Sequence, residues 1–290
     1  FSFLVPGLAY VSLNPENDEK IVQLYQGNDG VISVVQAHPA YYPEDYNDLF
    51  IKQNNHYTLG GAGSLANEQR QAHLPLFIHG SAKSVFFLGM GTGITAGASL
   101  YHPVDKVVVA EVVPEVVTAA EEHFGTYANN LFSDDRASIV VEDGRNYLLA
   151  SKEKYDVIVS DLFEPWFAGA GLLYTREHFQ AARNRLDDNG IFVQWLPLYQ
   201  LSDREFSIIV RTFLEVFPEA TIWRGNFLPD KPIVMLVGHT GTAALDPQEF
   251  VGNVNALRNS GDDVLIDALV SVKGLGILVV SPQSKGNLSQ

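Results

Sequence analysis

From residue 83 onward, short runs of β-branched and aromatic residues alternate with segments of helical spacing. This alternation predicts a parallel sheet covered by helices, because parallel strands need long crossover connections. The expected strands are KSVFFLG (83–89), KVVVAEV (106–112), ASIVVED (137–143), YDVIVSD (155–161), GIFVQWL (190–196), ATIWRG (220–225) and PIVMLVG (232–238). The expected helices cover 93–100, 114–124, 144–152, 175–187 and 203–216.

The last two strands are joined by the short polar link NFLPDK, which predicts an antiparallel hairpin at the edge of the sheet. Seven strands with a closing hairpin are typical of class I S-adenosylmethionine enzymes. A dinucleotide-binding domain would continue with a sixth parallel strand instead. The expected fold is therefore α/β, a seven-stranded Rossmann-like sheet of the S-adenosylmethionine-dependent transferase class.

The chain divides into three parts by pattern. Residues 1–62 hold short alternating runs bounded by Asn, Gly and Pro, which predict a small antiparallel β subdomain. The segment SLANEQRQAHLPLFIHG has helical spacing and leads into the Rossmann-like domain, residues 63–257. Residues 258–290 form a tail in which we expect one helix.

The chain begins at Phe1 rather than Met, which suggests a piece of a longer chain or a mature protein after processing, and an arbitrary boundary is the alternative. If a membrane region precedes it, the domain would be tethered to a membrane. The expected location is accordingly the cytoplasm or the cytoplasmic face of a membrane.

Charge and residue usage exclude several classes of function. The net charge of −15 repels nucleic acid and anionic membrane surfaces. The absence of cysteine excludes disulfides, thiolate catalysis and Cys-based metal sites. His56, His73, His79 and His102 do not fall at metal-ligand spacing, so no metal is expected.

Three glycines, Gly89, Gly91 and Gly93, follow the first strand of the sheet and open a helix. A turn of this kind lets a ligand approach the backbone closely, which favours a cofactor loop. A tight turn needed only for packing is the alternative, and the loop alone does not decide between them.

Carboxylates end the next strands: Glu111 the second, Asp143 the third and Asp161 the fourth. The carboxyl ends of parallel strands meet in the crevice where open α/β sheets bind ligands. Glu111 there can accept hydrogen bonds from ribose hydroxyls, and Asp143 can reach an adenine amine. Asp161 and Glu164 in SDLFEP can orient an amine or take its proton, although Glu164 also suits a helix cap or a surface charge.

The segments FFLGMGTGIT, VVVAEVVPEVV, VVEDGRNYLL, YDVIVSDLFEP and GIFVQWLPLY together resemble the spermidine synthase (polyamine aminopropyltransferase) family over residues of roughly 20 to 240. The resemblance implies a small N-terminal β subdomain before a Rossmann-like domain. It also implies aminopropyl transfer from decarboxylated S-adenosylmethionine to an amine.

Individual residues carry this resemblance. Asp161 and Glu164 align with the catalytic acid pair, Glu111 with the ribose-binding acid, and Asp143, followed by Gly144, with the adenine-contacting acid. His73 in RQAHLPLF matches a histidine of a family helix.

Departures from the family pattern concern the amine side of the site. Thr92 stands where the family's GGGDGG loop carries an aspartate that receives the aminopropyl ammonium. Gly63, Asn67 and Gln69 replace acids and a tyrosine that hold the diamine, and Val113 replaces a further aspartate. Thr92 would not repel the methionine carboxylate, so ordinary S-adenosylmethionine is a second candidate cofactor.

The predicted site thus has three groups of residues. Catalysis is assigned to Asp161 and Glu164. Cofactor binding is assigned to Gly89, Gly91, Thr92, Gly93, Glu111, Asp143, Gly144 and Asp161. The substrate pocket is assigned to Gln69, His73, Trp166, Gln194 and Tyr199. Core packing is the alternative for Gln194 and Tyr199, and a partner contact is the alternative for Trp166.

The predicted function is transfer of an aminopropyl group to a polyamine or another amine. One alternative is an enzyme of undecarboxylated S-adenosylmethionine: a methyltransferase, aminocarboxypropyl transferase, lyase or cyclase. The other is a non-catalytic cofactor-binding domain. The expected partners are a small-molecule amine and a second copy of the chain in a homo-oligomer, a dimer, with no nucleic acid.

Overall fold

Two β-sheets organise the protein. The computed structural model describes residues 19–37, 48–54, 57–163, 169–225, 230–241, 247–258 and 277–279. Four strands form an antiparallel N-terminal sheet, and eight form a mixed sheet that carries the rest of the fold. Glu164 and Trp166, both predicted at the site, lie outside the described residues.

The mixed sheet contains all seven predicted strands. They are β5 (Ser84–Leu88), β6 (Lys106–Glu111), β7 (Ala137–Val141), β8 (Tyr155–Ser160), β9 (Leu186–Pro197), β10 (Thr221–Arg224) and β11 (Ile233–His239). Their order, with β12 at the edge, is β12-β10-β11-β9-β8-β5-β6-β7. Strands β5 to β9 pair in parallel, and β11 pairs antiparallel with both β9 and β10. The predicted Rossmann-like transferase fold is confirmed.

Two elements near the C-terminus were not predicted. Strand β12 (Ile277–Val279) pairs antiparallel with β10, so the β10–β11 hairpin is not the edge of the sheet as predicted. Helix α7 (Pro247–Arg258) packs on α1 through the rings of Phe77 and Phe250, whose centroids are 5.9 Å apart. Most of the tail in which a helix was expected lies outside the described residues.

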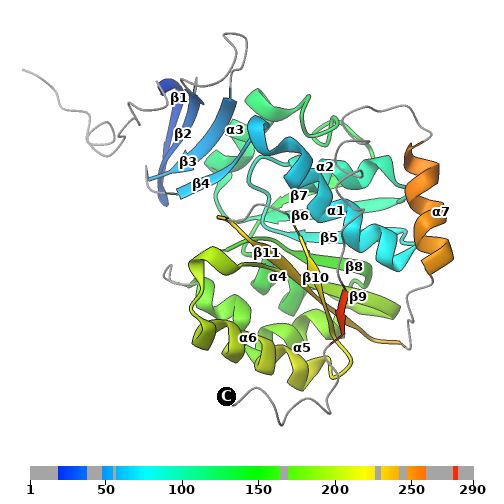
Figure 1. Ribbon diagram of the computed structural model, residues 1–290. Helices are drawn as coiled ribbons and strands as arrows, with labels where there is room; N and C mark the ends of the chain where they lie inside the picture. The colour runs from blue at the N-terminus through cyan, green and yellow to red at the C-terminus, as the bar shows by residue number, and fades with distance from the viewer. Residues whose placement is uncertain are drawn as a thin grey trace, which may run out of the picture.

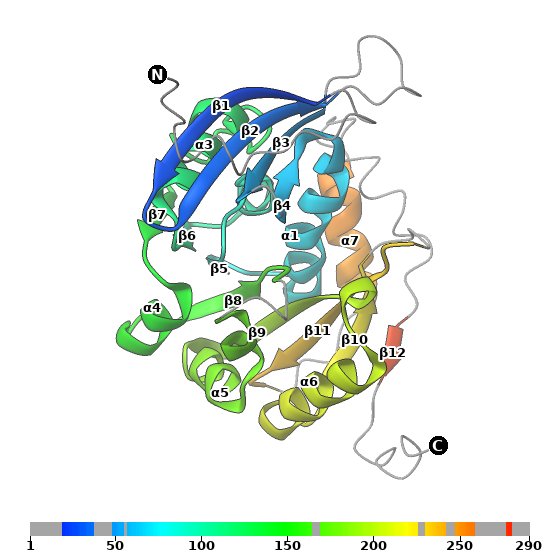
Figure 2. The ribbon, with the colours of Figure 1, turned by 90° about the vertical axis from the view of Figure 1, so that its left-hand side faces the viewer.

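Helices cover both faces of the mixed sheet, as Figures 1 and 2 show. One face carries α1 (Leu65–His79), α2 (Ile94–Ala98), α3 (Pro114–Phe124) and α7. The other carries α4 (Gly144–Ala150), α5 (Arg176–Asn184) and α6 (Asp203–Val216). Alternate residues of β5 enter the two cores, Val85 and Phe87 on one side and Phe86 and Leu88 on the other. A strand buried on both faces explains the continuous apolar run in the sequence.

The N-terminal sheet consists of β1 (Lys20–Gly27), β2 (Gly30–Ala37), β3 (Asp48–Gln53) and β4 (Tyr57–Gly61), all antiparallel. Its apolar residues Ile32, Val34 and Ile51 belong to the same buried cluster as Val116 and other α3 residues. Figure 2 shows the sheet lying over α3 beside the larger sheet. This packing brings the end of β4 and the start of α1 to the glycine turn after β5.

The order of the strands places a switch point between β5 and β8. From β5 the chain proceeds to β6 and β7 on one side, and from β8 to β9 on the other. Open α/β sheets bind ligands at such a point, outside the carboxyl ends of the strands. No helix among the described residues is long and apolar enough to cross a bilayer.

Candidate active site

A cavity of about 550 Å³ lies at this switch point. It is lined by the glycine turn, the ends of β6 and β8, the start of α4, parts of the segment between β8 and α5, and the N-terminal sheet. Six of the predicted site residues line it: Gly89, Gly91, Glu111, Asp143, Gly144 and Asp161. The N-terminal sheet contributes residues that no sequence pattern predicted: Asp29, Gln53, Asn54, Tyr57 and Leu59.

The glycine turn has a conformation that only glycine adopts easily. Gly89, Gly91 and Gly93 have φ values of +90°, +55° and +78°. A Cβ on Gly91 would lie 2.8 Å from the carbonyl oxygen of Leu59 in β4. The turn therefore packs against the N-terminal sheet and also lines the cavity. Its glycines are needed for packing, and the turn is placed where a cofactor loop would be.

A substitution at Gly91 tests the packing contribution. We expect Gly91→Ala to lower the free energy of unfolding by about 2–3 kcal/mol, because it adds a backbone clash to an unfavourable φ. Gly169→Ala is the matched control, since Gly169 has a φ of +93° but no atom of the described residues within 4 Å of its Cβ position. Urea unfolding measures both variants. Equal losses would mean that the Leu59 carbonyl does not restrict the turn.

The side chain of Glu111 links the end of β6 to the glycine turn. Its carboxylate accepts hydrogen bonds from the backbone N–H of Met90 at 3.1 Å and of Val113 at 3.0 Å. Burial raises the pKa of Glu111, and these backbone hydrogen bonds oppose the rise. A carboxylate at this position suits an acceptor for vicinal hydroxyl groups, such as those of a ribose.

Asp143 begins helix α4. Its Oδ1 accepts a hydrogen bond of 2.9 Å from the backbone N–H of Asn146, so it is the N-cap of the helix. Its neighbours Gly144 and Arg145 also line the cavity. A Cβ on Gly144 would lie 2.6 Å from Cγ of Leu88, so glycine is needed for α4 to pack against β5.

Asp161 follows β8 and lies at the centre of the site. Its backbone N–H donates to the carbonyl of Leu88 at 3.3 Å, which places it beside the start of the glycine turn. Its Oδ1 accepts a hydrogen bond of 2.7 Å from the N–H of Leu162. Burial, with additions from the charges of Glu68 and Glu111, raises the pKa of Asp161 to about 7. A carboxylate with that pKa is suited to general base catalysis near neutral pH.

Three side chains hold the backbone of residues 161–163. Tyr57 donates to the carbonyl of Leu162 at 3.3 Å, and Tyr174 donates to that of Phe163 at 3.1 Å. Gln194 is fully buried, and its Nε2 donates to the carbonyl of Asp161 at 3.4 Å. Gln194, predicted in the substrate pocket, therefore supports the loop from behind. Tyr57 was missed because it is distant from SDLFEP in the sequence, and Tyr174 because no local pattern marks it.

Several other predicted site residues do not line the cavity. On α1, Gln69 and His73 are turned into the core, with 3% and 1% of their surface exposed. Nδ1 of His73 lies 2.8 Å from Nε2 of His102, and burial holds the pKa of His73 well below its usual range. Tyr199 is 44% exposed in the 3₁₀ turn after β9.

Thr92 and Gly93 lie in the glycine turn but point away from the cavity. Gly93 faces Leu131 and Phe132, and Thr92 is 1% exposed. The Oγ1 of Thr92 donates a hydrogen bond of 2.5 Å to Oε2 of Glu68. Glu68 was not among the predicted site residues, although it lies next to Gln69 in helix α1.

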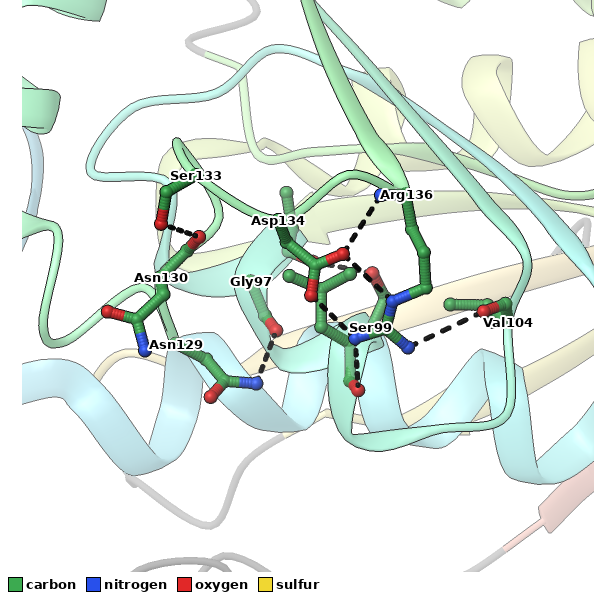
Figure 3. A network of polar contacts seen from close by, with 10 residues as sticks. Gly97, Ser99, Val104, Asn129, Asn130, Ser133, Asp134 and Arg136 are labelled. Carbon is green, nitrogen blue, oxygen red and sulfur yellow. Dashed lines mark hydrogen bonds and ion pairs between the residues drawn. The ribbon is translucent and has the colours of Figure 1, made fainter.

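A polar network braces the other side of the turn (Figure 3). Arg136 forms an ion pair with Asp134 at 2.7 Å, and its guanidinium donates to the carbonyl of Leu100 at 3.2 Å. Asn129 of the same segment donates to the carbonyl of Gly97 in α2 at 3.4 Å. These contacts secure α2 and the short 3₁₀ helix that follows it. Among the described residues, no group of three or more His, Asp or Glu side chains could hold a metal ion.

Comparisons with known proteins agree with this arrangement. The model of the family described as "Spermine/spermidine synthase domain" matches residues 66–223. The polyamine aminopropyltransferase of Thermotoga maritima is 31% identical over 179 residues, which are 61% of this chain and 59% of that protein. The enzyme of the same name from Buchnera aphidicola is 28% identical over 155 residues, 53% of this chain and 54% of that protein. The chain thus spans about half the length of the curated relatives it matches.

A solved structure shares the fold. A spermidine synthase in complex with the transition state analogue AdoDATO superposes with a TM-score of 0.67 at 22% identity, covering 86% of this chain and 83% of that one. At this identity the likeness bears on the fold.

Proposed function

The chain belongs to the spermine/spermidine synthase domain family, and we propose that its cavity transfers an aminopropyl group from decarboxylated S-adenosylmethionine to a small amine. The observation that carries the proposal is the half-buried Asp161, with a pKa raised to about 7, in a cavity shared with Glu111 and the glycine turn. The likeness to a spermidine synthase bound to a transition state analogue supports it.

The residues present fit this cofactor. Glu111 offers a carboxylate for the ribose hydroxyls, and Asp143 with the start of α4 offers polar groups for the adenine. The sulfonium cation suits a cavity in which Glu111, Asp143 and Asp161 supply negative charge. Decarboxylated S-adenosylmethionine contributes an electrophilic methylene carbon next to its sulfonium sulfur.

In the proposed reaction the amine nitrogen attacks that methylene carbon, and the carbon–sulfur bond breaks. The sulfur keeps the bonding electron pair, so methylthioadenosine leaves, and the proton of the attacking nitrogen passes to Asp161. Gln194, Tyr57 and Tyr174 hold the backbone around Asp161, which keeps its carboxylate in place. Positioning two cations that otherwise repel each other is the main contribution of such a site, and the carboxylates offset their charge. Glu164 remains a proposed partner of Asp161.

One observation favours a second candidate. Thr92 replaces the acid that the resemblance places in the glycine turn, so the turn itself does not oppose a carboxylate on the cofactor. An enzyme that uses ordinary S-adenosylmethionine would exploit this difference. Homo-oligomerisation and a cytoplasmic location, free or at the membrane face, stay predictions from the sequence, and light scattering of the purified chain tests the first.

Product analysis tests the proposed function. The purified protein is incubated with putrescine and either decarboxylated or ordinary S-adenosylmethionine, and the products are separated by chromatography. The proposal expects methylthioadenosine and an aminopropylated amine in the first mixture. S-adenosylhomocysteine, or methylthioadenosine from the second mixture alone, would favour the second candidate. Binding without any product would favour a non-catalytic domain.

The raised pKa of Asp161 predicts how cofactor affinity depends on pH. An acid with a raised pKa is ionised above it, so the attraction for the sulfonium and ammonium groups weakens as the pH falls through about 7. Below that value we expect the affinity for decarboxylated S-adenosylmethionine to fall by up to about tenfold per pH unit. Calorimetry between about pH 5.5 and 8 measures this, with uncharged methylthioadenosine as the control ligand. Parallel pH profiles for the two ligands would contradict the assignment.

A further inference from the structure

The glycine turn lacks an acid of its own, but a carboxylate reaches it from helix α1. Glu68 lies in the first turn of α1, and its Oε2 accepts the hydrogen bond of Thr92 Oγ1 at 2.5 Å. Thr92 is the position at which the resemblance expects an aspartate. Glu68 therefore brings a carboxyl group to the place where the sequence of the turn has none.

Two further hydrogen bonds orient this carboxyl group. Its Oε1 accepts from the N–H of Gly61 at 2.9 Å and from the hydroxyl of Ser64 at 2.5 Å. The Ser64 hydroxyl has a single proton and also lies 2.9 Å from the carbonyl oxygen of Gly61, so the committed donors are the N–H of Gly61 and the hydroxyl of Thr92. Two donors, one on each oxygen, suit an ionised carboxylate, which only accepts hydrogen bonds. Burial, together with the charge of Asp48, raises the pKa of Glu68 and opposes ionisation. A cation beside Glu68 would resolve this conflict in favour of the charged form.

Glu68, Gly60 and Thr92 are not lining residues of the cavity, but they lie directly behind two residues that are, Leu59 and Gly91. Gly60 lies against both partners: a Cβ there would be 2.8 Å from Oε1 of Glu68 and 3.0 Å from Cγ2 of Thr92. The adjacent Leu59 lines the cavity and contacts Gly91. The absence of a side chain at Gly60 thus leaves room for Glu68 and Thr92 to meet between β4, the start of α1 and the glycine turn.

Glu68 also acts on the other acids of the site. Its charge contributes to the raised pKa of Asp161, so the two carboxylates are near enough to repel each other. Glu111 contributes in the same sense from the end of β6. The glycine turn is therefore surrounded by carboxylates that come from α1, β6 and β8.

We propose that Glu68, held against Thr92, is the specificity-determining carboxylate for the tail of the S-adenosyl cofactor. It attracts a tail that carries only an ammonium group and repels a tail that also carries a carboxylate. This inference rests on the proposed function and names the residue that selects the decarboxylated cofactor. Thr92 alone would allow ordinary S-adenosylmethionine to bind. Glu68 changes this expectation, because helix α1 supplies the carboxylate that the glycine turn lacks.

Glu68→Gln tests the inference, since it removes the charge and keeps the size of the side chain. Calorimetry is carried out with decarboxylated S-adenosylmethionine, ordinary S-adenosylmethionine and methylthioadenosine, which has no charged tail. In the variant we expect affinity for the decarboxylated cofactor to fall about 10- to 100-fold. Affinity for the ordinary cofactor should stay constant or rise, and that for methylthioadenosine should stay within about twofold. Glu121→Gln, on the exposed face of α3, is the matched control.

A second variant tests whether a carboxylate at a different position can replace that of Glu68. The double variant Glu68→Gln, Thr92→Asp places the carboxylate in the turn and should restore the preference for the decarboxylated cofactor. An unchanged preference in Glu68→Gln, or an equal loss for all three ligands, would overturn the role of Glu68 and leave the proposed function standing. If the unsubstituted protein binds none of the three ligands, the proposed function fails and the inference fails with it.

Discussion

Asp161→Asn is expected to lower kcat about 1,000-fold, within the range usual for loss of a general base. Asparagine has nearly the same size and shape but cannot take the proton of the attacking amine. Initial rates of methylthioadenosine formation at saturating cofactor measure the effect. Asp188→Asn is the matched control and should keep full activity. Asp188 is an exposed carboxylate near the start of β9, whereas the site lies at the carboxyl ends of the strands.

The same variant should be more stable than the parent protein. The pKa of Asp161 is higher in the folded state than the ordinary value of 3.8. Ionisation of Asp161 in the folded protein therefore lowers the free energy of unfolding progressively as the pH rises from about 4 to about 7. At about pH 8 we expect Asp161→Asn to raise the Tm, by roughly 2–4 °C per kcal/mol recovered, and at about pH 4 to leave it unchanged. A variant with full activity and an unaltered Tm at both pH values would remove Asp161 from its assigned role.

Glu111→Gln should have the largest effect on binding of the nucleoside. The substitution replaces a charged acceptor by a neutral one at the expected ribose contact, which corresponds to about 1.5–3 kcal/mol. We expect the Kd for methylthioadenosine to rise about 10- to 100-fold. Calorimetry measures the change, and Glu142→Gln, an exposed carboxylate just beyond β7, is the control. Because methylthioadenosine carries no charged tail, a lost affinity reports on the nucleoside half of the site.

An unchanged Kd in Glu111→Gln would show that the ribose lies elsewhere. A lower Tm accompanied by a higher Kd would instead point to loss of the hydrogen bonds that Glu111 accepts from the backbone N–H groups of Met90 and Val113. Measurement of unfolding beside binding separates these two outcomes.

The large sheet and the acids at its strand ends could be predicted because their signals are local. A buried parallel strand such as β5 is a continuous apolar run, and the residue that follows it must lie at the carboxyl edge of the sheet. Gly89, Glu111, Asp143 and Asp161 were located in this way, and the structure brings all four to one cavity. Strand β12 has three residues and pairs with a partner far along the chain, so it left no such signal.

The contribution of the N-terminal sheet depends on packing between distant segments. Leu59 touches the glycine turn, and Tyr57 holds residue 162, only because β4 lies over the end of the larger sheet. Neither position has a distinctive local pattern. The first turn of α1 shows the same limit in another form: Glu68 and Gln69 are neighbours in sequence, yet one faces the glycine turn and the other the core. Successive residues of a helix are rotated by about 100° about its axis. The sequence does not show which of the two residues is rotated toward the glycine turn.

A crystal structure with decarboxylated S-adenosylmethionine bound is the most direct test of the whole account. The account predicts the ribose hydroxyls within hydrogen-bonding distance of Glu111, the sulfonium beside Asp161, and the ammonium of the tail directed at the carboxylate of Glu68 next to Thr92. An adenosine outside this cavity, or a tail that turns away from both Asp161 and Glu68, would contradict it.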